Sequence, residues 1–302
     1  MKTATFPSGV NSSHDTEVFN SKQNVQEYYT QTGPDYEIWS KDFNMHFGLA
    51  LNPLDCSSRE KMLRQMNSYV FKKLGLKSLD SGTIYDLGCG LSAPLRQAAR
   101  SFYKLEFCGV TIVPWQVQQS KKMIGEEMLP NAEVNLKDYS STNYTESSAE
   151  GVYFIESLCH GDGLDKAAPL NEAYRLLKPG RKLVIADGMT LVEPKNFGKF
   201  LHSIYRLVCD NWALSDMANV HATIKRLKQI GFKNIQCEDV SWKIAPSAIQ
   251  SPFLSIYFFV KKMIKREHIT EQGIRNLKAC FSIFFLGLFR KQIGYFIITA
   301  EK

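Results

Sequence analysis

The sequence predicts an α/β fold in which helices cover both faces of a parallel sheet. A short apolar strand ends at Asp86 and is followed by the turn Gly88-Cys89-Gly90. Residues 165–177 carry apolar side chains at helical spacing. Further apolar stretches of strand length lie at 105–112, 135–138, 150–155 and 181–187. Strands and helices that alternate in this way build a parallel sheet whose ligands lie across the carboxyl ends of its strands.

The turn after Asp86 indicates a site for a nucleotide-type cofactor. Gly88 and Gly90 allow positive φ angles and let the backbone approach a ligand with no Cβ in the way. The third glycine of the dinucleotide fingerprint is absent, because Ala93 stands three residues after Gly90 and Pro94 follows. S-adenosylmethionine is therefore a better candidate than a pyrophosphate cofactor, although a GxG pattern alone is common in tight turns.

The composition is that of one compact protein. The chain has 302 residues, 44% of them hydrophobic, which is enough for one α/β domain with a cap. Its seven cysteines form no CxxC pair, which indicates reduced thiols in a cytoplasmic protein and no disulfide or metal framework. The first ten residues lack an apolar stretch, so neither a signal peptide nor an anchor is expected there.

The net charge of +7 is concentrated in residues 251–293, where eight Lys or Arg residues face two acidic ones and give +6. The same segment holds the apolar runs 252–260 and 280–289, which are shorter than the ~20 residues that a bilayer-spanning helix needs. These runs predict a lid that covers an apolar pocket and rests on a membrane surface. The alternative is that they are a pair of core helices with a solvated basic face. No nucleic-acid partner is expected, because the basic residues are not interleaved with regularly spaced stacking aromatics.

Several motifs together resemble those of class I S-adenosylmethionine-dependent methyltransferases. YDLGCG at 85–90 is similar to the family's first motif, and IESLCH at 155–160 is similar to its fourth-strand motif. LLKPG at 176–180 and GYFIITAEK at 294–302 resemble the turn before the fifth strand and the closing strand. GVTIVPWQV at 109–117 resembles the second strand of the sterol, tocopherol and terpenoid methyltransferases, which act on carbon of lipophilic substrates.

The resemblance covers nearly the whole chain and implies a Rossmann-like seven-stranded sheet. It departs from the family pattern at Arg181, where a second glycine is common, and in the lid, which matches in pattern only. The expected division of the chain is a disordered segment at 1–20, an N-terminal helical cap at 21–74, the cofactor-binding core at 75–242, an apolar basic helical lid at 243–293 and the last strand at 294–302.

The resemblance also implies how the site holds its cofactor. Gly88 and Gly90 would approach the methionine portion, and Asp86 would order that turn directly or through water. The carboxylate that usually grips the ribose at the end of the second strand is missing. By resemblance, Gln116 takes the ribose hydroxyls and Ile112 packs on the adenine.

Further cofactor contacts are expected after the third strand and in the cap. Asp138 and Tyr139 would meet the adenine edge, with a solvated turn as the alternative for Asp138. Aromatic faces attract a sulfonium cation by about 0.5 to 2 kcal/mol and supply no nucleophile that would take the methyl group. Simple packing is the alternative for each tyrosine. The expected cofactor-binding residues are Tyr28, Asp86, Gly88, Cys89, Gly90, Thr111, Ile112, Gln116, Asp138, Tyr139 and Glu156.

Glu156, His160 and Tyr36 are the expected catalytic residues. When an alkene attacks a methyl group, the product is a carbocation that π faces or a carboxylate must shelter until a base removes a proton. Glu156 would stabilise the cation or abstract the proton, and His160 would act as base or orient the substrate. The structural alternatives are a capping or cofactor-binding glutamate and a hydrogen-bonded core histidine. The expected substrate-binding residues are Tyr29, Trp39, His46 and Phe47.

The leading hypothesis is a cytoplasmic C-methyltransferase for a lipophilic isoprenoid or terpenoid substrate. A prenyl diphosphate such as geranyl or farnesyl diphosphate would use both the apolar wall and the basic lid, with Mg²⁺ as its counterion and with cyclisation after methylation. A sterol or a prenylated phenol would need only the wall. The alternatives are a small-molecule N- or O-methyltransferase and, from another class, a catalytically inactive membrane-surface binding protein. Peripheral membrane contact and a homodimer are compatible with this hypothesis.

Overall fold

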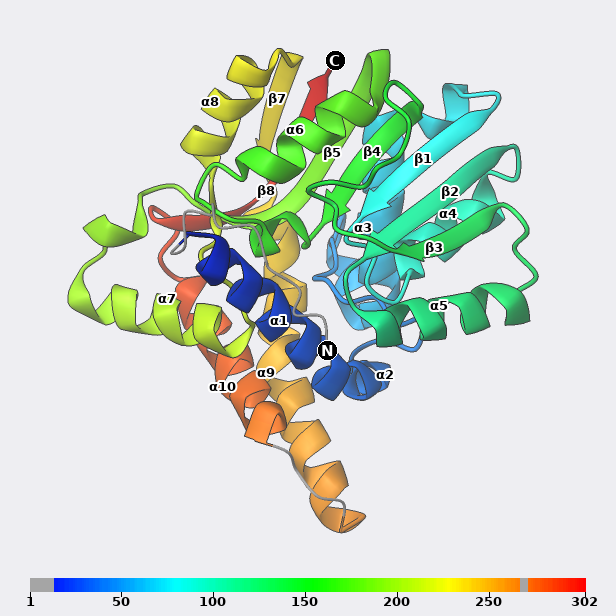
Figure 1. The fold of residues 1–302 in the computed structure, drawn as a ribbon. Helices are drawn as coiled ribbons and strands as arrows, with labels where there is room; N and C mark the ends of the chain where they lie inside the picture. The colour runs from blue at the N-terminus through cyan, green and yellow to red at the C-terminus, as the bar shows by residue number, and fades with distance from the viewer. Residues whose placement is uncertain (1–13, 267–270) are drawn as a thin grey trace, which may run out of the picture.

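The structure is a computed structural model that describes residues 14–266 and 271–302. Its described residues contain one mixed sheet with the strand order β3-β2-β1-β4-β5-β8-β7 (Figure 1). Strands β1 to β5 are parallel, and β8 runs antiparallel between β5 and β7. The strands are β1 Gly82–Leu87, β2 Leu105–Thr111, β3 Ala132–Leu136, β4 Ala149–Ile155, β5 Leu177–Thr190, β6 Ala218–Asn219, β7 Lys233–Asp239 and β8 Ile293–Glu301.

This topology confirms the fold class that the sequence predicts. The two-residue strand β6, which pairs with β5, is an addition that the sequence did not indicate. Strand β3 ends at Leu136, so Asp138 and Tyr139 lie in the loop that follows it and not at the strand's end. Pro114 is the first residue of the helix after β2, where its fixed φ suits the first turn and its missing N–H costs no hydrogen bond.

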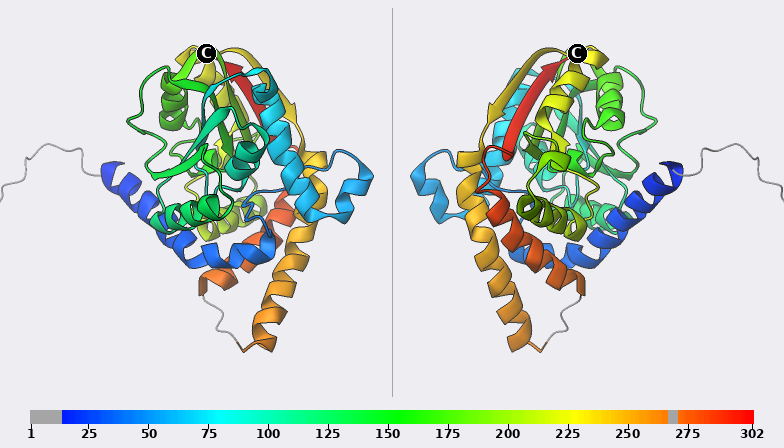
Figure 2. Two further views of the ribbon diagram at one scale, coloured as in Figure 1. Left: turned by 90° about the vertical axis from the view of Figure 1, so that its right-hand side faces the viewer. Right: turned by 90° about the vertical axis from the view of Figure 1, so that its left-hand side faces the viewer.

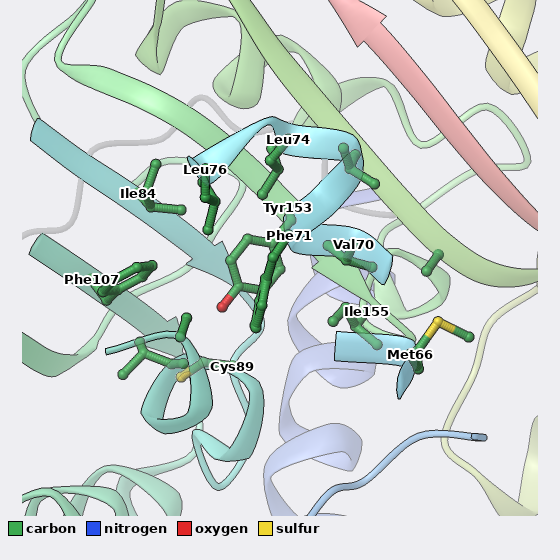
Figure 3. Close-up of a cluster of buried hydrophobic side chains, with 14 of the residues drawn as sticks. Met66, Val70, Phe71, Leu74, Leu76, Ile84, Cys89, Phe107, Tyr153 and Ile155 are labelled. Carbon is green, nitrogen blue, oxygen red and sulfur yellow. The ribbon is translucent and has the colours of Figure 1, made fainter. Parts of the chain in front are cut away.

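Helices cover both faces of the sheet and enclose two hydrophobic clusters. Because side chains alternate along a strand, Tyr153 and Ile155 of β4 join the cluster under α3 and α4, which Figure 3 shows. Val152 and Phe154 of the same strand join the cluster under α6 and α8. The helices of these layers are α3 Arg59–Leu74, α4 Ala93–Ser101, α5 Pro114–Glu126, α6 Ala167–Leu176 and α8 Val220–Ile230.

The remaining helices gather beside the carboxyl ends of the parallel strands (Figure 1). Helix α10 packs against α7 and α9 and also contacts α1. Residues 14–20 are helical where disorder was expected, and residues 1–13 lie outside the described residues. These helices are α1 His14–Thr32, α2 Tyr36–Trp39, α7 Lys199–Asn211, α9 Ser241–Ile264 and α10 Glu271–Leu286.

Helices α9 and α10 project beyond the body of the molecule (Figure 2). Neither of them, nor any other helix in the described ranges, has the length and apolar character needed to cross a membrane. The chain therefore builds a sheet core with a helical roof over one edge, and the roof is where a ligand site is to be sought.

Candidate active site

Two adjoining cavities lie under the helical roof. The larger, of about 440 Å³, is lined by α1, α2, α9, α10 and the ends of β4, β5 and β8. The smaller lies over the ends of β1, β2 and β4 and contains the glycine turn. The side chains of Tyr29, Met45, His46, Glu156 and His160 line both cavities. These five side chains therefore surround the passage from one cavity to the other.

The glycine turn brings bare backbone to the smaller cavity. Gly88 has a φ of 90° and Gly90 a φ of 52°, both in the left-handed region. The turn is held by the N–H groups of Gly88 and Cys89, which both donate to the carbonyl of Val110, at 3.0 and 2.9 Å. A Cβ at Gly88 would lie 2.4 Å from the Cβ of Ser157. Glycine is therefore needed here for conformation and for space.

Gln116 reaches this cavity from the first turn of α5 and is almost fully buried. Its Oε1 accepts a hydrogen bond of 2.6 Å from the hydroxyl of Thr111, which fixes the direction of the amide group. Ile112 lines the same cavity, but its carbonyl already accepts from Nε2 of Gln26 in α1 at 2.8 Å. The structure thus brings Thr111, Ile112 and Gln116 together beside the glycine turn.

Asp138 and Tyr139 close the opposite wall of the smaller cavity. The carboxylate of Asp138 accepts from the N–H of Ser140 at 2.7 Å and pairs with Nζ of Lys22 at 2.5 Å. The hydroxyl of Tyr139 donates to the carbonyl of Ser157 at 3.0 Å. Lys22 belongs to α1, so this helix covers the rim of the cavity. Its ion pair engages the Asp138 carboxylate, which was expected to meet the adenine.

Glu156 directly follows β4 and adopts a left-handed backbone conformation with a φ of 49°. Such a conformation is costly for a residue other than glycine and is often found at functional sites. Its Oε1 accepts hydrogen bonds from the N–H of Phe47 at 2.7 Å and from the hydroxyl of Tyr295 at 2.9 Å. Burial raises the pKa of the Glu156 carboxyl to about 8, against the opposing effect of these two donors. A cation in the passage would favour its ionised form.

His160 lies one short turn beyond Glu156 and faces α1. Its Nε2 is 3.0 Å from the hydroxyl of Tyr29, and the two rings meet edge to face. Burial, together with the ammonium group of Lys166, lowers the pKa of His160 to about 4. The imidazole is therefore neutral near pH 7, and the same surroundings make it a weak base.

Lys166 is a component of this site that the sequence gave no reason to single out. It is fully buried, and its Nζ donates to the carbonyls of Cys159, Gly161 and Asp216 at 3.0, 2.6 and 2.7 Å. Burial lowers the pKa of this ammonium group. Its three hydrogen bonds tie the loop that carries His160 to the loop before β6.

Three residues that line the cavities were also missed. Tyr295 lies in a segment that the sequence indicated only as a strand, and Met45 lies in one that it indicated only as part of an aromatic cap. Asp187 lies at the carboxyl end of β5, a position that could have been recognised as facing a ligand site. Its carboxylate accepts from the N–H of Cys159 at 3.0 Å, and burial raises its pKa to about 7.

Most of the expected aromatic residues of the cap line only the larger cavity, whereas Tyr29 lines both. Tyr28 was expected at the cofactor, but its hydroxyl donates to Oδ1 of Asn276 in α10 at 3.0 Å, and it lines only the larger cavity. Tyr36 and Phe47 line the same cavity. The guanidinium carbon of Arg59 lies 3.5 Å from the centre of the Trp39 ring, so a positive charge stacks on this wall of the cavity.

His46 is held as part of the framework. Its Nδ1 lies 2.9 Å from the carbonyl of Phe47, and its Nε2 lies 3.1 Å from Oδ1 of Asn44. Burial lowers the pKa of its ring to about 4. The neutral ring has one N–H, so it donates to one of these two oxygen atoms.

Comparison with known proteins assigns this arrangement to a family. Residues 84–180 match the family model described as a methyltransferase domain. The O-methyltransferase cnsE of Penicillium expansum is 32% identical over 226 residues, which cover 72% of this chain and 71% of that protein. The chain belongs to the class I S-adenosylmethionine-dependent methyltransferases. The resemblance seen in the strand motifs is confirmed by these matches.

Other proteins that are similar to this methyltransferase have names that include a substrate. The 2-methyl-6-phytyl-1,4-hydroquinone methyltransferase of Synechocystis is 27% identical over 174 residues, which cover 56% of this chain and 52% of that protein. The mycolic acid cyclopropane synthase CmaA1 shares the fold with a TM-score of 0.80 at 14% identity, over 93% of this chain and 98% of that one. The geranyl diphosphate C-methyltransferase of Streptomyces coelicolor, solved with Mg²⁺ and geranyl diphosphate, has a TM-score of 0.67 at 12% identity, over 93% and 97% of the two chains.

The basic residues at the far end of α9 line neither cavity of the methyltransferase; they are Lys261, Lys262, Lys265 and Arg266. Lys262 pairs with Asp35 at 2.9 Å. The larger cavity has one arginine in its lining, Arg290, and its guanidinium pairs with Asp239 at 2.7 Å. The part of the chain that the structure describes contains no cluster of His, Cys, Asp and Glu suited to a metal ion. The expected use of the lid charges on a diphosphate stays a prediction.

Proposed function

We propose that this methyltransferase transfers a methyl group to a carbon atom of a lipophilic, isoprenoid-type acceptor that carries no diphosphate. The observation that supports it best is the arrangement of the two cavities, which meet at Glu156 and His160. The glycine turn lies in one, and the other has walls that are mainly aromatic and aliphatic. A methyl donor in the first cavity would thus face an apolar acceptor in the second.

The residues of the smaller cavity suit S-adenosylmethionine. Gly88 and Gly90 offer a backbone that a Cβ would block, and Gln116 offers an amide whose direction is fixed by Thr111. When bound, this cofactor supplies an activated methyl group on a sulfonium centre. Lys22 would have to leave Asp138 before that carboxylate could meet an adenine edge, so binding is expected to shift α1 at its contact with the loop after β3.

The residues at the passage have separate tasks in the proposed reaction. The apolar walls hold the acceptor in line with the methyl group and exclude water, and positioning of this kind supplies much of the rate enhancement in a displacement. Glu156 lies where positive charge develops on the acceptor, and that charge would keep its carboxyl ionised. His160 is neutral near pH 7 and takes the proton that leaves the methylated acceptor. Tyr29 orients His160 through its hydroxyl.

The charges around the larger cavity favour an uncharged acceptor over a prenyl diphosphate. Arg290, the basic side chain of Lys or Arg type in its described lining, is already paired with Asp239. The lining carboxyl of Asp35 is paired with Lys262. A diphosphate would therefore need Mg²⁺ or another cation to offset its charge. A sterol or a prenylated phenol needs only the apolar walls. We further propose that the enzyme is cytoplasmic.

O-methylation is the second candidate, because the relative with 32% identity is named an O-methyltransferase. A phenol hydroxyl in the passage could hydrogen-bond to the neutral His160, whose Nε2 is 3.0 Å from the hydroxyl of Tyr29. The two reactions differ in the atom that receives the methyl group, so a product analysis separates them.

The test is incubation with methyl-deuterated S-adenosylmethionine and three acceptors, a sterol, a prenylated hydroquinone and geranyl diphosphate with Mg²⁺. Mass spectrometry and fragmentation locate the label. Label on a ring or side-chain carbon of an uncharged acceptor is the expected result. Label on oxygen supports the second candidate, and turnover of geranyl diphosphate alone overturns the choice of an uncharged acceptor. Absence of turnover with retained vesicle binding would support the inactive membrane-binding alternative.

A further inference from the structure

The outward face of α9 is apolar where a surface helix is normally polar. Phe253, Tyr257, Val260 and Ile264 follow one another at intervals of three or four residues, and their exposed fractions are 69%, 57%, 45% and 78%. α9 (Ser241–Ile264) contains no acidic residue. Flanking side chains that are also exposed are Ile249, Ile256 and Met263.

Basic residues border the projecting end of this apolar surface. Phe285 and Leu288, in and just after α10, are also 47% and 66% exposed, but they lie at the other end of α10, toward β8. Lys261, Lys265 and Arg266 stand at the end of α9, at the part of the molecule that projects farthest from the sheet (Figure 2). Exposed apolar side chains that form a continuous patch mark an interaction site, whereas isolated ones do not.

We propose that the projecting end of α9 and α10 docks on an anionic bilayer surface. A helix that shows an apolar face and a basic border is typical of interfacial binding, in which the apolar side chains enter the boundary between head groups and acyl chains. The basic residues would then meet anionic head groups, and each basic residue adds to the affinity for the bilayer. The apolar runs are too short to span the membrane, which agrees with a helix that lies on it.

A second copy of the chain fits this surface less well. In a two-fold symmetric dimer the same patch meets itself, and an axis through the projecting tip would bring the cluster of Lys261, Lys265 and Arg266 near the same cluster of the partner. Like charges repel, whereas an anionic bilayer attracts them. The charges therefore favour a lipid surface.

The docked position would also supply the acceptor, a consequence that rests on the proposed function. The same two helices line the larger cavity with their inner faces, through residues such as Ile244, Leu254, Phe258 and Leu277. A lipophilic acceptor could move from the bilayer along these helices into the cavity without crossing water. Vesicle binding itself does not depend on catalysis, so the two ideas can fail separately.

The test is flotation of the full chain with vesicles of phosphatidylcholine alone or with 30% phosphatidylserine. We expect binding to the anionic vesicles and weak binding to the neutral ones. The variant Phe253→Ser/Tyr257→Ser/Ile264→Ser should lower the partition coefficient at least about tenfold, and none of its residues lines a cavity. Lys261→Gln/Lys265→Gln/Arg266→Gln should lower it by about fivefold per charge on anionic vesicles.

The matched control is Leu54→Ser/Tyr103→Ser/Met128→Ser, which removes three apolar side chains of similar exposure, 80%, 78% and 83%, from other parts of the surface. It should bind like the parent. Equal losses in the control and the α9 variant would overturn the proposal, as would absence of vesicle binding by the parent. A parent that is dimeric by light scattering, with a monomeric α9 variant and no vesicle binding by either, would identify the surface as a protein interface.

Discussion

Replacing Asp86 by Asn should make the folded protein less sensitive to pH. Asp86 ends β1 with 3% of its surface exposed, and its hydrogen-bond donor is the hydroxyl of Tyr153 at 3.0 Å. Burial raises the pKa of this carboxyl to about 7 from an ordinary value of 3.8. In the folded protein the proton is retained over a pH range in which the unfolded chain has released it. Folding therefore loses stability as the pH rises between these two values, and the loss is complete above the higher one.

The size of the effect follows from the two pKa values. The full penalty above pH 7 is on the order of 4 kcal/mol, and about half of it develops between pH 5.5 and 8.0. The amide cannot ionise, and its oxygen can still accept from Tyr153. The stability of Asp86→Asn relative to the parent should thus increase by about 2 kcal/mol between those two pH values. Glu156 and Asp187 impose the same direction of change on both proteins, so the comparison cancels them.

The assay is urea unfolding of the cofactor-free protein and of the variant at pH 5.5 and pH 8.0. Substituting the exposed Asp80 by Asn, a few residues before β1, is the control for a change of charge at the surface. A difference between variant and parent that is the same at both pH values would refute the reasoning, whatever the absolute stabilities. The reasoning would also be refuted if Asp80→Asn gained as much stability relative to the parent between the two pH values as Asp86→Asn does.

Three further predictions concern the site. Gly90→Val should abolish binding of S-adenosylmethionine in calorimetry, because φ is 52° and a Cβ would lie 3.0 Å from the sulfur of Met45; an affinity within a few-fold of the parent would contradict this. Gln116→Ala should weaken the binding of S-adenosylmethionine by about 0.5 to 1.5 kcal/mol. Glu156→Gln should keep the affinity for the cofactor and lose turnover. If Glu156→Gln loses affinity instead, Glu156 is a binding residue. Lys166→Met should cost about 3 to 5 kcal/mol in urea unfolding, because buried carbonyls lose their charged donor; a cost under about 1 kcal/mol would show that the loops hold without it.

The sequence by itself determined the sheet and the glycine turn. The strands could be recognised because apolar runs and turn residues act over a few neighbouring positions. Gly88 and Gly90 could be identified because a positive φ and a close ligand approach are properties of single residues. The position of Gln116 at the start of a helix followed in the same way from Pro114.

Only the tertiary structure decided which side chains meet across the cavities. Tyr295 reaches Glu156 from 139 positions away along the chain, and Lys166 becomes buried only when the loop before β6 folds over it. Tyr28 faces α10 and not the cofactor turn, since the direction of a helix face depends on what packs against it. For the same reason the basic residues of α9 project from the molecule and do not enter the pocket. Contacts of this kind arise from the packing of distant segments, and no local pattern of residues encodes them.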